Sequence, residues 1–338
     1  MTALAAFRDG IRRVNGAPAI LWGLVLVTLL VSLPLAMVVR GMIEVHLGPS
    51  ATAALAAERG SYDWLEEFAA QASGIGRTLT PSVTGFAAVL DNAGGLLDNR
   101  PLAPTIIGVT TAWLVLWTFL SGGVLDRLAR QRPTRSHGFF AACGTHFWRF
   151  LRLGLVAAVV YVVLFGAVHD WLFTAAYGRL TRDVTVERTA FAVRTGAYVV
   201  FSAGLAAFAL LFDYARVRIV VEDRRSALGA LVSAGRFLSR YRRRAAALFL
   251  LNAGALLALM ALYAVAAPGA LAGLRGWVAL ALGQTYIIGR HYLKLLMYAS
   301  ETALFQGTLA HAGYTAAPAV VWPESPAVET IENAGPQA

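Results

Sequence analysis

Five polar side chains near the C-terminus fall on one face of a predicted helix and could carry chemistry. Within ALALGQTYIIGRHYLKLLMYASETALF, residues 279–305, they are separated by seven, three, four and three positions, as on one side of an α-helix: Gln284, His291, Lys294, Tyr298 and Glu301. An imidazole titrates near neutral pH, and a lysine inside a membrane needs a negative partner. We therefore take this stripe as a candidate binding site, as in a proton or substrate path.

A structural alternative for the same segment is an anchor at the membrane surface. If a span starts at Trp277 and rises 1.5 Å per residue, Arg290 lies about 20 Å and Lys294 about 26 Å along it. Both long side chains could then extend to the inner interface. There they could form ion pairs with Asp213 or Asp126, each of which follows another apolar run.

No recognised catalytic motif accompanies the stripe. The sequence has no HExxH pair, no Walker loop, no GxGxxG after a strand, and a single cysteine, Cys143. Acidic and histidine residues of segment 40–104 could be assembled into a metal site, but their spacing does not require one: Glu44, His46, Asp63, Glu66 and Glu67. We therefore expect no catalytic residue, no metal and no cofactor.

The elements that must hold these residues are membrane-spanning helices, so the fold class is an all-α polytopic bundle. Of 338 residues, 58% are hydrophobic and 14% are charged, whereas soluble proteins are about a quarter charged. The net charge of +10 does not indicate a nucleic-acid partner, because the arginines cluster beside apolar runs. A span takes roughly 20 apolar residues, which predicts six: 18–39, 105–125, 151–171, 195–213, 245–267 and 277–299.

The distribution of basic residues predicts the orientation of the spans. The N-terminus and the loops 126–152 and 214–244 carry eighteen, and the three opposite loops carry nine. The positive-inside rule then places both termini in the cytoplasm of a bacterial inner membrane. The first apolar run lacks a clear cleavage site, so we expect a retained span. One membrane domain over 1–314 would precede a disordered Pro- and Ala-rich cytoplasmic tail over 315–338.

The loop 214–244 predicts an amphipathic helix on the inner membrane surface. From Ser226 onward, apolar residues recur every three or four positions with arginines between them. Such a helix could bury its apolar face in the leaflet and offer basic side chains to anionic headgroups. Alternatively, it packs on the inner ends of its own bundle. The candidate headgroup contacts are Arg225, Arg236, Arg240, Arg242, Arg243 and Arg244.

Two further patterns concern the loops. Asp126 and Arg135-Ser136 correspond in order to Asp213 and Arg225-Ser226. This predicts a second interfacial helix and either a duplicated unit or the convergent composition of basic inner loops. The external segment 40–104 predicts two short helices, SYDWLEEFAAQA and PSVTGFAAVLDNAGG. The second would start after a Thr80 cap and stop at Gly94-Gly95.

The stretch FDYARVRIVVEDRRSALGALVSAGRFLSR and the later YLKLLMYASETALFQ resemble a family of six-span bacterial membrane proteins. These are in turn similar to the membrane domain found with some glycerophosphodiester phosphodiesterases. The resemblance covers about the last 140 residues and implies an all-helical bundle without an assigned activity. The catalytic domain of those phosphodiesterases has no counterpart here, so their hydrolase activity does not carry over.

Three classes of function remain open from the sequence. The absence of catalytic motifs favours a non-enzymatic membrane subunit or scaffold with a membrane protein partner. The stripe and the apparent repeat favour a transporter or permease-like protein, and a lipid-handling enzyme would use the interfacial arginines. If the protein is a transporter, we expect a cavity that reaches Gln284 and His291. If it is an enzyme, we expect an acid, a base and a nucleophile in one pocket.

Overall fold

The computed structural model describes residues 1–48, 53, 61–79, 85–102, 104–267 and 273–309. Every regular element in these ranges is helical, so the all-α fold class is confirmed for this part of the chain. The α-helices are α1 (Ala3–Asn15), α2 (Pro18–Leu47), α4 (Tyr62–Gln71), α5 (Gly85–Leu97), α6 (Pro104–Arg130), α7 (Ser136–Val163), α8 (Tyr177–Thr181), α9 (Glu187–Val221), α10 (Ala227–Ala266) and α11 (Gly273–Gln306). A 3₁₀ turn, η1 (Gly74–Thr78), and two π-helical turns, η3 (Leu164–Val168) and η4 (Trp171–Ala176), complete the set.

Within the described ranges, five helices are long and apolar enough to cross a membrane. They are Pro18–Leu47, Pro104–Arg130, Ser136–Thr181, Glu187–Val221 and Ala227–Ala266. Their outer faces expose large apolar side chains, for example Leu30, Val162 and Val265. Side chains of this kind suit contact with lipid, where each helix satisfies its own backbone hydrogen bonds. The predicted sixth span lies in α11, which has 34 residues but is not among the five.

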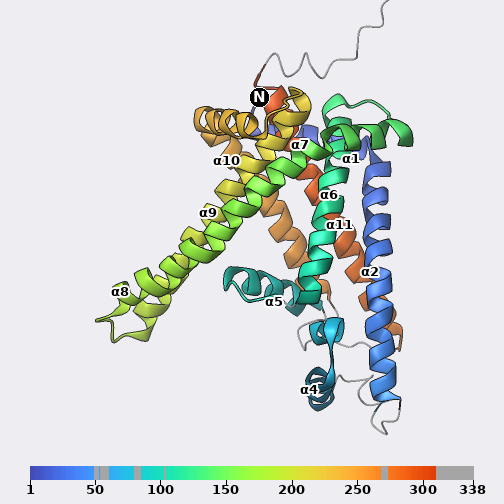
Figure 1. The fold of residues 1–338 in the computed structure, drawn as a ribbon, viewed down its shortest axis with the longest axis vertical. Coiled ribbons are helices and arrows are strands. Elements are labelled where there is room, and N and C mark those ends of the chain that lie inside the picture. Colours follow the sequence, from blue (N-terminus) through green and yellow to red (C-terminus); the bar gives the residue numbers. More distant parts are fainter. Residues whose placement is uncertain (49–52, 54–60, 80–84, 103, 268–272, 310–338) are drawn as a thin grey trace, which may run out of the picture.

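The helices diverge from one end of the molecule (Figure 1). At that end α1, the start of α10 and the α6–α7 junction gather over the last turns of α11, whereas α4 and α5 lie toward the opposite end. Below we call these the α1 end and the α4 end. The buried core is concentrated toward the α1 end, where Tyr214, Ile219, Leu304 and Phe305 are fully enclosed.

The α1 helix was not predicted from the sequence. Thr2 caps it by accepting a hydrogen bond from the backbone N–H of Ala5 at 3.2 Å. Its inner face packs on α11, where Gly10 lies so close to Ser300 that an added Cβ would sit 2.8 Å from the Ser300 Cβ. Arg13 donates hydrogen bonds to Gln306 Oε1 at 2.7 Å and to the carbonyl of Leu128 at 3.1 Å.

Helix α10 bends at Tyr241, whose φ of −114° and ψ of 25° lie outside the helical range. The bend separates an amphipathic segment, 227–240, from a longer segment, 242–266, which begins with three arginines and is apolar from Ala245 onward. Ala230, Ala234 and Phe237 of the first segment are buried against the bundle. The predicted periodicity therefore corresponds in part to packing on the bundle itself. Leu228 remains exposed on the outer side of the same segment.

Helix α7 continues without a break where an interfacial helix and a separate span were expected. It runs from Ser136 into the third apolar segment, forming 46 continuous helical residues with its π-helical turns and α8. Its first turns lie against α6, because Gly122 and Gly123 leave no side chain between the two backbones. A Cβ at Gly123 would fall 2.6 Å from the sulfur of Cys143.

At the α4 end, the first predicted external helix is present as α4, capped by Ser61. The second is present as α5, but the expected stop at Gly94-Gly95 was wrong. The helix continues to Leu97 and ends where Asn99 takes a left-handed conformation, with φ of 52°. The Thr80 cap and the predicted disordered tail, 315–338, fall outside the described residues.

Candidate functional site

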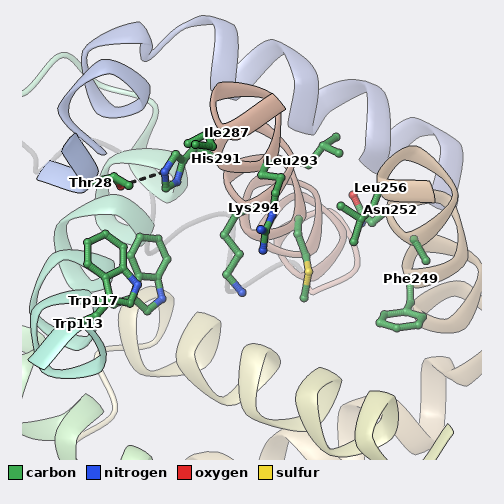
Figure 2. Close-up of a pocket in the computed structure, with 13 residues that line it drawn as sticks. Thr28, Trp113, Trp117, Phe249, Asn252, Leu256, Ile287, His291, Leu293 and Lys294 are labelled. Atoms are coloured by element: carbon green, nitrogen blue, oxygen red, sulfur yellow. Dashed lines mark hydrogen bonds between the residues drawn. The ribbon is translucent and has the colours of Figure 1, made fainter. Parts of the chain in front are cut away.

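A groove of about 600 Å³ lies beside the middle of α11 (Figure 2). Helices α2, α6, α10 and α11 contribute its walls. The lining residues are Thr28, Trp113, Trp117, Phe249, Asn252, Ala253, Leu256, Ile287, Arg290, His291, Leu293, Lys294 and Met297. Two residues of the predicted stripe, His291 and Lys294, are thus in the groove.

His291 is held by a hydroxyl from the first apolar helix. Its Nε2 lies 3.0 Å from Thr28 Oγ1, and the same hydroxyl donates to the carbonyl of Leu24 at 2.8 Å. A hydroxyl has a single proton to donate, so the contact to His291 is satisfied when Nε2–H donates to Thr28. This arrangement leaves Nδ1 as the acceptor of the neutral imidazole.

Lys294 extends from α11 into the space between the α6 tryptophans and Phe249 (Figure 2). Its Nζ lies 4.6 Å from the centre of the Tyr298 ring, a cation–π contact. No ion pair within 4.0 Å joins Lys294 or Arg290 to a carboxylate in the described ranges. The Arg290 guanidinium lies 5.9 Å from the Tyr286 ring centre.

The predicted direct ion pairs of Lys294 and Arg290 with Asp213 or Asp126 are not present in the described ranges, although Asp213 acts on Lys294 electrostatically. Asp213 pairs with Arg216 at 2.7 Å, and Asp126 pairs with Arg130 at 2.6 Å. In each case the partner lies one helical turn further along the same helix, at the i+3 or i+4 position that brings side chains together. These local partners occupy the carboxylates that the stripe was expected to use.

The rest of the stripe is divided between two other environments. Tyr298 and Glu301 are 0% and 2% exposed, inside the core next to α9. The Tyr298 hydroxyl accepts a hydrogen bond from Arg216 Nη1 at 3.1 Å, and its ring stacks on Trp117 at 6.1 Å. Glu301 Oε2 is buried and has no hydrogen-bond partner. Gln284 does not line the groove, so the five residues do not form one continuous site.

Several lining residues could not be found from the stripe alone, because they come from other helices. Trp113 and Trp117 are four positions apart on α6, and that spacing is the only sequence signal that they share a face. Asn252 is a lone polar residue in an apolar run. Its Nδ2 donates to Ser300 Oγ at 3.1 Å, which joins α10 to α11.

The six candidate headgroup contacts are all exposed, and none pairs with a carboxylate in the part of the chain that the structure describes. They are Arg225, Arg236, Arg240, Arg242, Arg243 and Arg244. Arg225 lies in the turn before α10, Arg236 and Arg240 lie in the first segment of α10, and the other three directly follow the bend at Tyr241. The start of α10 is at the α1 end (Figure 1). An exposed cluster of one sign attracts anions at a membrane surface.

The acidic and histidine residues of segment 40–104 have other partners. Glu44 pairs with Arg40 at 2.7 Å, and His46 Nδ1 accepts a hydrogen bond from Trp64 Nε1 at 2.9 Å. Asp63, Glu66 and Glu67 are exposed on α4. Their side chains do not come together with those of Glu44 and His46. Across the described ranges, no three such residues are grouped to hold a metal ion.

No family model, no curated protein and no solved structure matches this chain. The resemblance to six-span membrane proteins and to the membrane domain of glycerophosphodiester phosphodiesterases therefore remains a prediction. What the fold defines is a helical protein with several apolar helices of membrane-spanning length. Its function has to be argued from the groove.

Proposed function

We propose that this chain is a permease-like integral membrane protein that binds an anionic ligand in the α11 groove. One observation carries the proposal: Arg290, His291 and Lys294 line the groove, and none of its 13 lining residues is acidic. A basic side chain inside an apolar protein is costly unless a negative group accompanies it. Asp213 and Glu301 act on Lys294 electrostatically from outside the groove, and a bound anion would supply a negative group within it.

The proposed topology has six spans, with α11 as the sixth and both termini in the cytoplasm of a bacterial inner membrane. Under this proposal the α1 end, with its exposed arginines, faces the cytoplasm and contacts anionic headgroups. The first segment of α10 would then lie at the inner interface. The start of α10, which carries exposed arginines, lies at the α1 end (Figure 1), and this supports the orientation.

Cysteine labelling in intact cells tests the topology. Replacing the single buried cysteine, Cys143→Ala, gives a background in which one new thiol can be introduced. We expect a membrane-impermeant maleimide to label Asp98→Cys in spheroplasts with intact inner membranes. Arg240→Cys should be labelled only after that membrane is permeabilised. The reverse pattern would contradict the orientation.

Native mass spectrometry tests the ligand proposal. We expect the protein, extracted from its own membranes in mild detergent, to carry an acidic small molecule or lipid in stoichiometric amount. Lys294→Gln should reduce its occupancy at least tenfold, whereas Arg240→Gln, the same change of charge outside the groove, should retain it. Equal occupancy in wild type and Lys294→Gln would contradict binding in the groove.

A membrane subunit or scaffold is the second candidate function. The supporting observation is the outer side of the first α10 segment, where Leu228 and Val232 are 63% and 56% exposed next to exposed arginines. Such a surface could contact a membrane protein partner as well as lipid. In the same experiment, a stoichiometric protein partner and no bound acidic molecule would favour this candidate. The lining residues offer a lipid-handling enzyme no carboxylate to act as acid or base.

A further inference from the structure

We infer that the ligand of the α11 groove is a lipid with an anionic phosphate headgroup, which enters sideways from the bilayer. This inference rests on the proposed function and names the class of its ligand. The phosphate would lie between Arg290 and Lys294, and the acyl chain would follow the aromatic wall. A free phosphate ion has the same headgroup chemistry, so the two sources must be separated by experiment.

The groove combines basic side chains with apolar walls. The basic side chains all come from α11, whereas Trp113 and Trp117 of α6 lie on one side of Lys294 and Phe249 and Leu256 of α10 lie on the other (Figure 2). A small hydrated anion would lose its water here and gain nothing from the apolar wall. An amphiphile suits both parts of the lining, because its chain buries apolar surface while its headgroup meets the cations.

The apolar wall continues into the lipid-exposed surface of the same helices. Leu114, next to Trp113 on α6, is 56% exposed. On α10, Leu250 and Leu257, which directly follow Phe249 and Leu256, are 68% and 63% exposed. A chain in the groove could therefore extend outward between α6 and α10 without crossing polar surface. A volume of about 600 Å³ would then have to hold only the headgroup and part of one chain.

The Lys294 ammonium is held in place before any ligand arrives. It lies over the Tyr298 ring, which is fixed by the Arg216 hydrogen bond on one side and by stacking on Trp117. Prior fixation of a cation reduces the entropy lost on binding. Arg290, one turn toward the α4 end, is exposed and has room to close on a second phosphate oxygen.

The test is thermal unfolding of the delipidated protein in a neutral detergent, with three probes: dioleoyl phosphatidylglycerol, dioleoyl phosphatidylcholine and glycerol 3-phosphate. We expect phosphatidylglycerol to raise the Tm by several degrees through mass action. The zwitterionic lipid, with the same chains, and the chain-free phosphate should each give less than a third of that shift. Lys294→Gln should lose the phosphatidylglycerol shift, and Arg240→Gln should keep it.

A second variant keeps the test decisive if Lys294→Gln does not fold. Ala253→Phe fills the groove from α10 without changing any charge. It should also lose the phosphatidylglycerol shift. Retention of the full shift in Ala253→Phe would overturn the inference.

The remaining outcomes separate the inference from the proposed function. An equal shift with glycerol 3-phosphate, lost in Lys294→Gln, would overturn the lipid inference and leave anion binding intact. Equal shifts with both lipids would indicate general lipid contact and would overturn it too. A phosphatidylglycerol shift that survives Lys294→Gln but disappears in Arg240→Gln would move binding to the α10 surface and contradict both proposals. No shift with either anionic probe would also contradict both.

Discussion

Asp213 of α9 and Glu301 of α11 are both buried carboxyl groups, yet their surroundings differ. Asp213, 3% exposed, has the Arg216 guanidinium at 2.7 Å, whereas one oxygen of Glu301, 2% exposed, has no hydrogen-bond partner. Removing one member of a buried ion pair leaves the other charge uncompensated. Neutralising a buried carboxyl without a hydrogen-bonded partner instead removes the free-energy cost of burying its charge.

These surroundings predict opposite effects for two isosteric substitutions. Asp213→Asn should destabilise the protein by about 3 kcal/mol, the lower end for a buried pair because Arg216 is partly exposed. Glu301→Gln should leave the free energy of unfolding within about 1 kcal/mol of wild type or increase it. Unfolding in detergent, followed by circular dichroism, measures both. If Glu301→Gln were the more destabilising variant, the attraction of the nearby cations Lys294 and Arg216 for the Glu301 carboxylate would outweigh the cost of burying its charge.

The residue scale also shows where sequence analysis of the site reached its limit. Lys294 and His291 were identified because their spacing on one helix is visible in the sequence. The contact between His291 and Thr28 joins positions 263 residues apart, and no local pattern encodes that separation. The pairing of Asp213 was missed for the opposite reason: its local i+3 partner, Arg216, was visible in the sequence, but a distant partner was expected instead.

At the scale of elements, glycines decide how closely the helices approach. Gly10 of α1 faces Ser300 of α11, and a Cβ there would lie 2.8 Å from the serine Cβ and 2.9 Å from its backbone nitrogen. Gly144 of α7 has nothing within 4 Å of the same constructed atom. Both are helical positions, so they differ in packing and not in backbone conformation.

Alanine substitution at these two glycines should therefore have opposite signs. Gly10→Ala must displace α1 from α11, and overpacking of this kind costs about 1–3 kcal/mol. Gly144→Ala should be neutral or stabilising by up to about 1 kcal/mol, because alanine is the better helix former. The comparison of their melting temperatures checks the prediction. A lower Tm for Gly144→Ala than for Gly10→Ala would contradict the observed α1–α11 contact.

The loop between α9 and α10 is tied to α7 by one exposed ion pair. Asp223, in a left-handed conformation with φ of 49°, accepts a hydrogen bond from Arg149 Nη1. This hydrogen bond lowers the pKa of Asp223 below the usual value for an aspartate. Because its pKa is lower in the folded protein, the Asp223 carboxylate stabilises the fold at pH values above the unfolded pKa of about 3.9. This stabilisation is lost as the pH falls from there through the folded-state pKa.

Stability measurements between pH 6 and pH 3 test this tie. Wild type should lose slightly more stability over the acid part of this range than Asp223→Asn, which has no carboxylate to protonate. The effect should be small, because the Asp223 side chain is 72% exposed and screened by solvent. Identical pH profiles for the two proteins would show that the pair contributes nothing measurable.

For the whole molecule, composition and apolar run length were enough to predict an all-helical membrane fold and the approximate positions of the long helices. The sequence did not predict that the first turns of α7 pack along α6 as part of one continuous helix. That packing depends on Gly122 and Gly123 of α6 contacting α7 residues some twenty positions further along the chain. Helix α1 was missed because its thirteen residues resemble a basic leader. Which side of α1 is buried is decided by its contact with α11, which lies far away in the sequence.

The contact between α1 and α11 has a consequence for how the protein is made. Arg13 and Gln306 are 293 positions apart, and together they bind the carbonyls of Leu128 and Ala129 at the end of α6. During synthesis α1 emerges first, but the helix on which it packs emerges after α10. Helix α1 therefore has no α11 surface to pack on until the end of the chain has been made. The α1 end of the bundle can close only once α11 has been made, so assembly of this core is a late event in the life of each new chain.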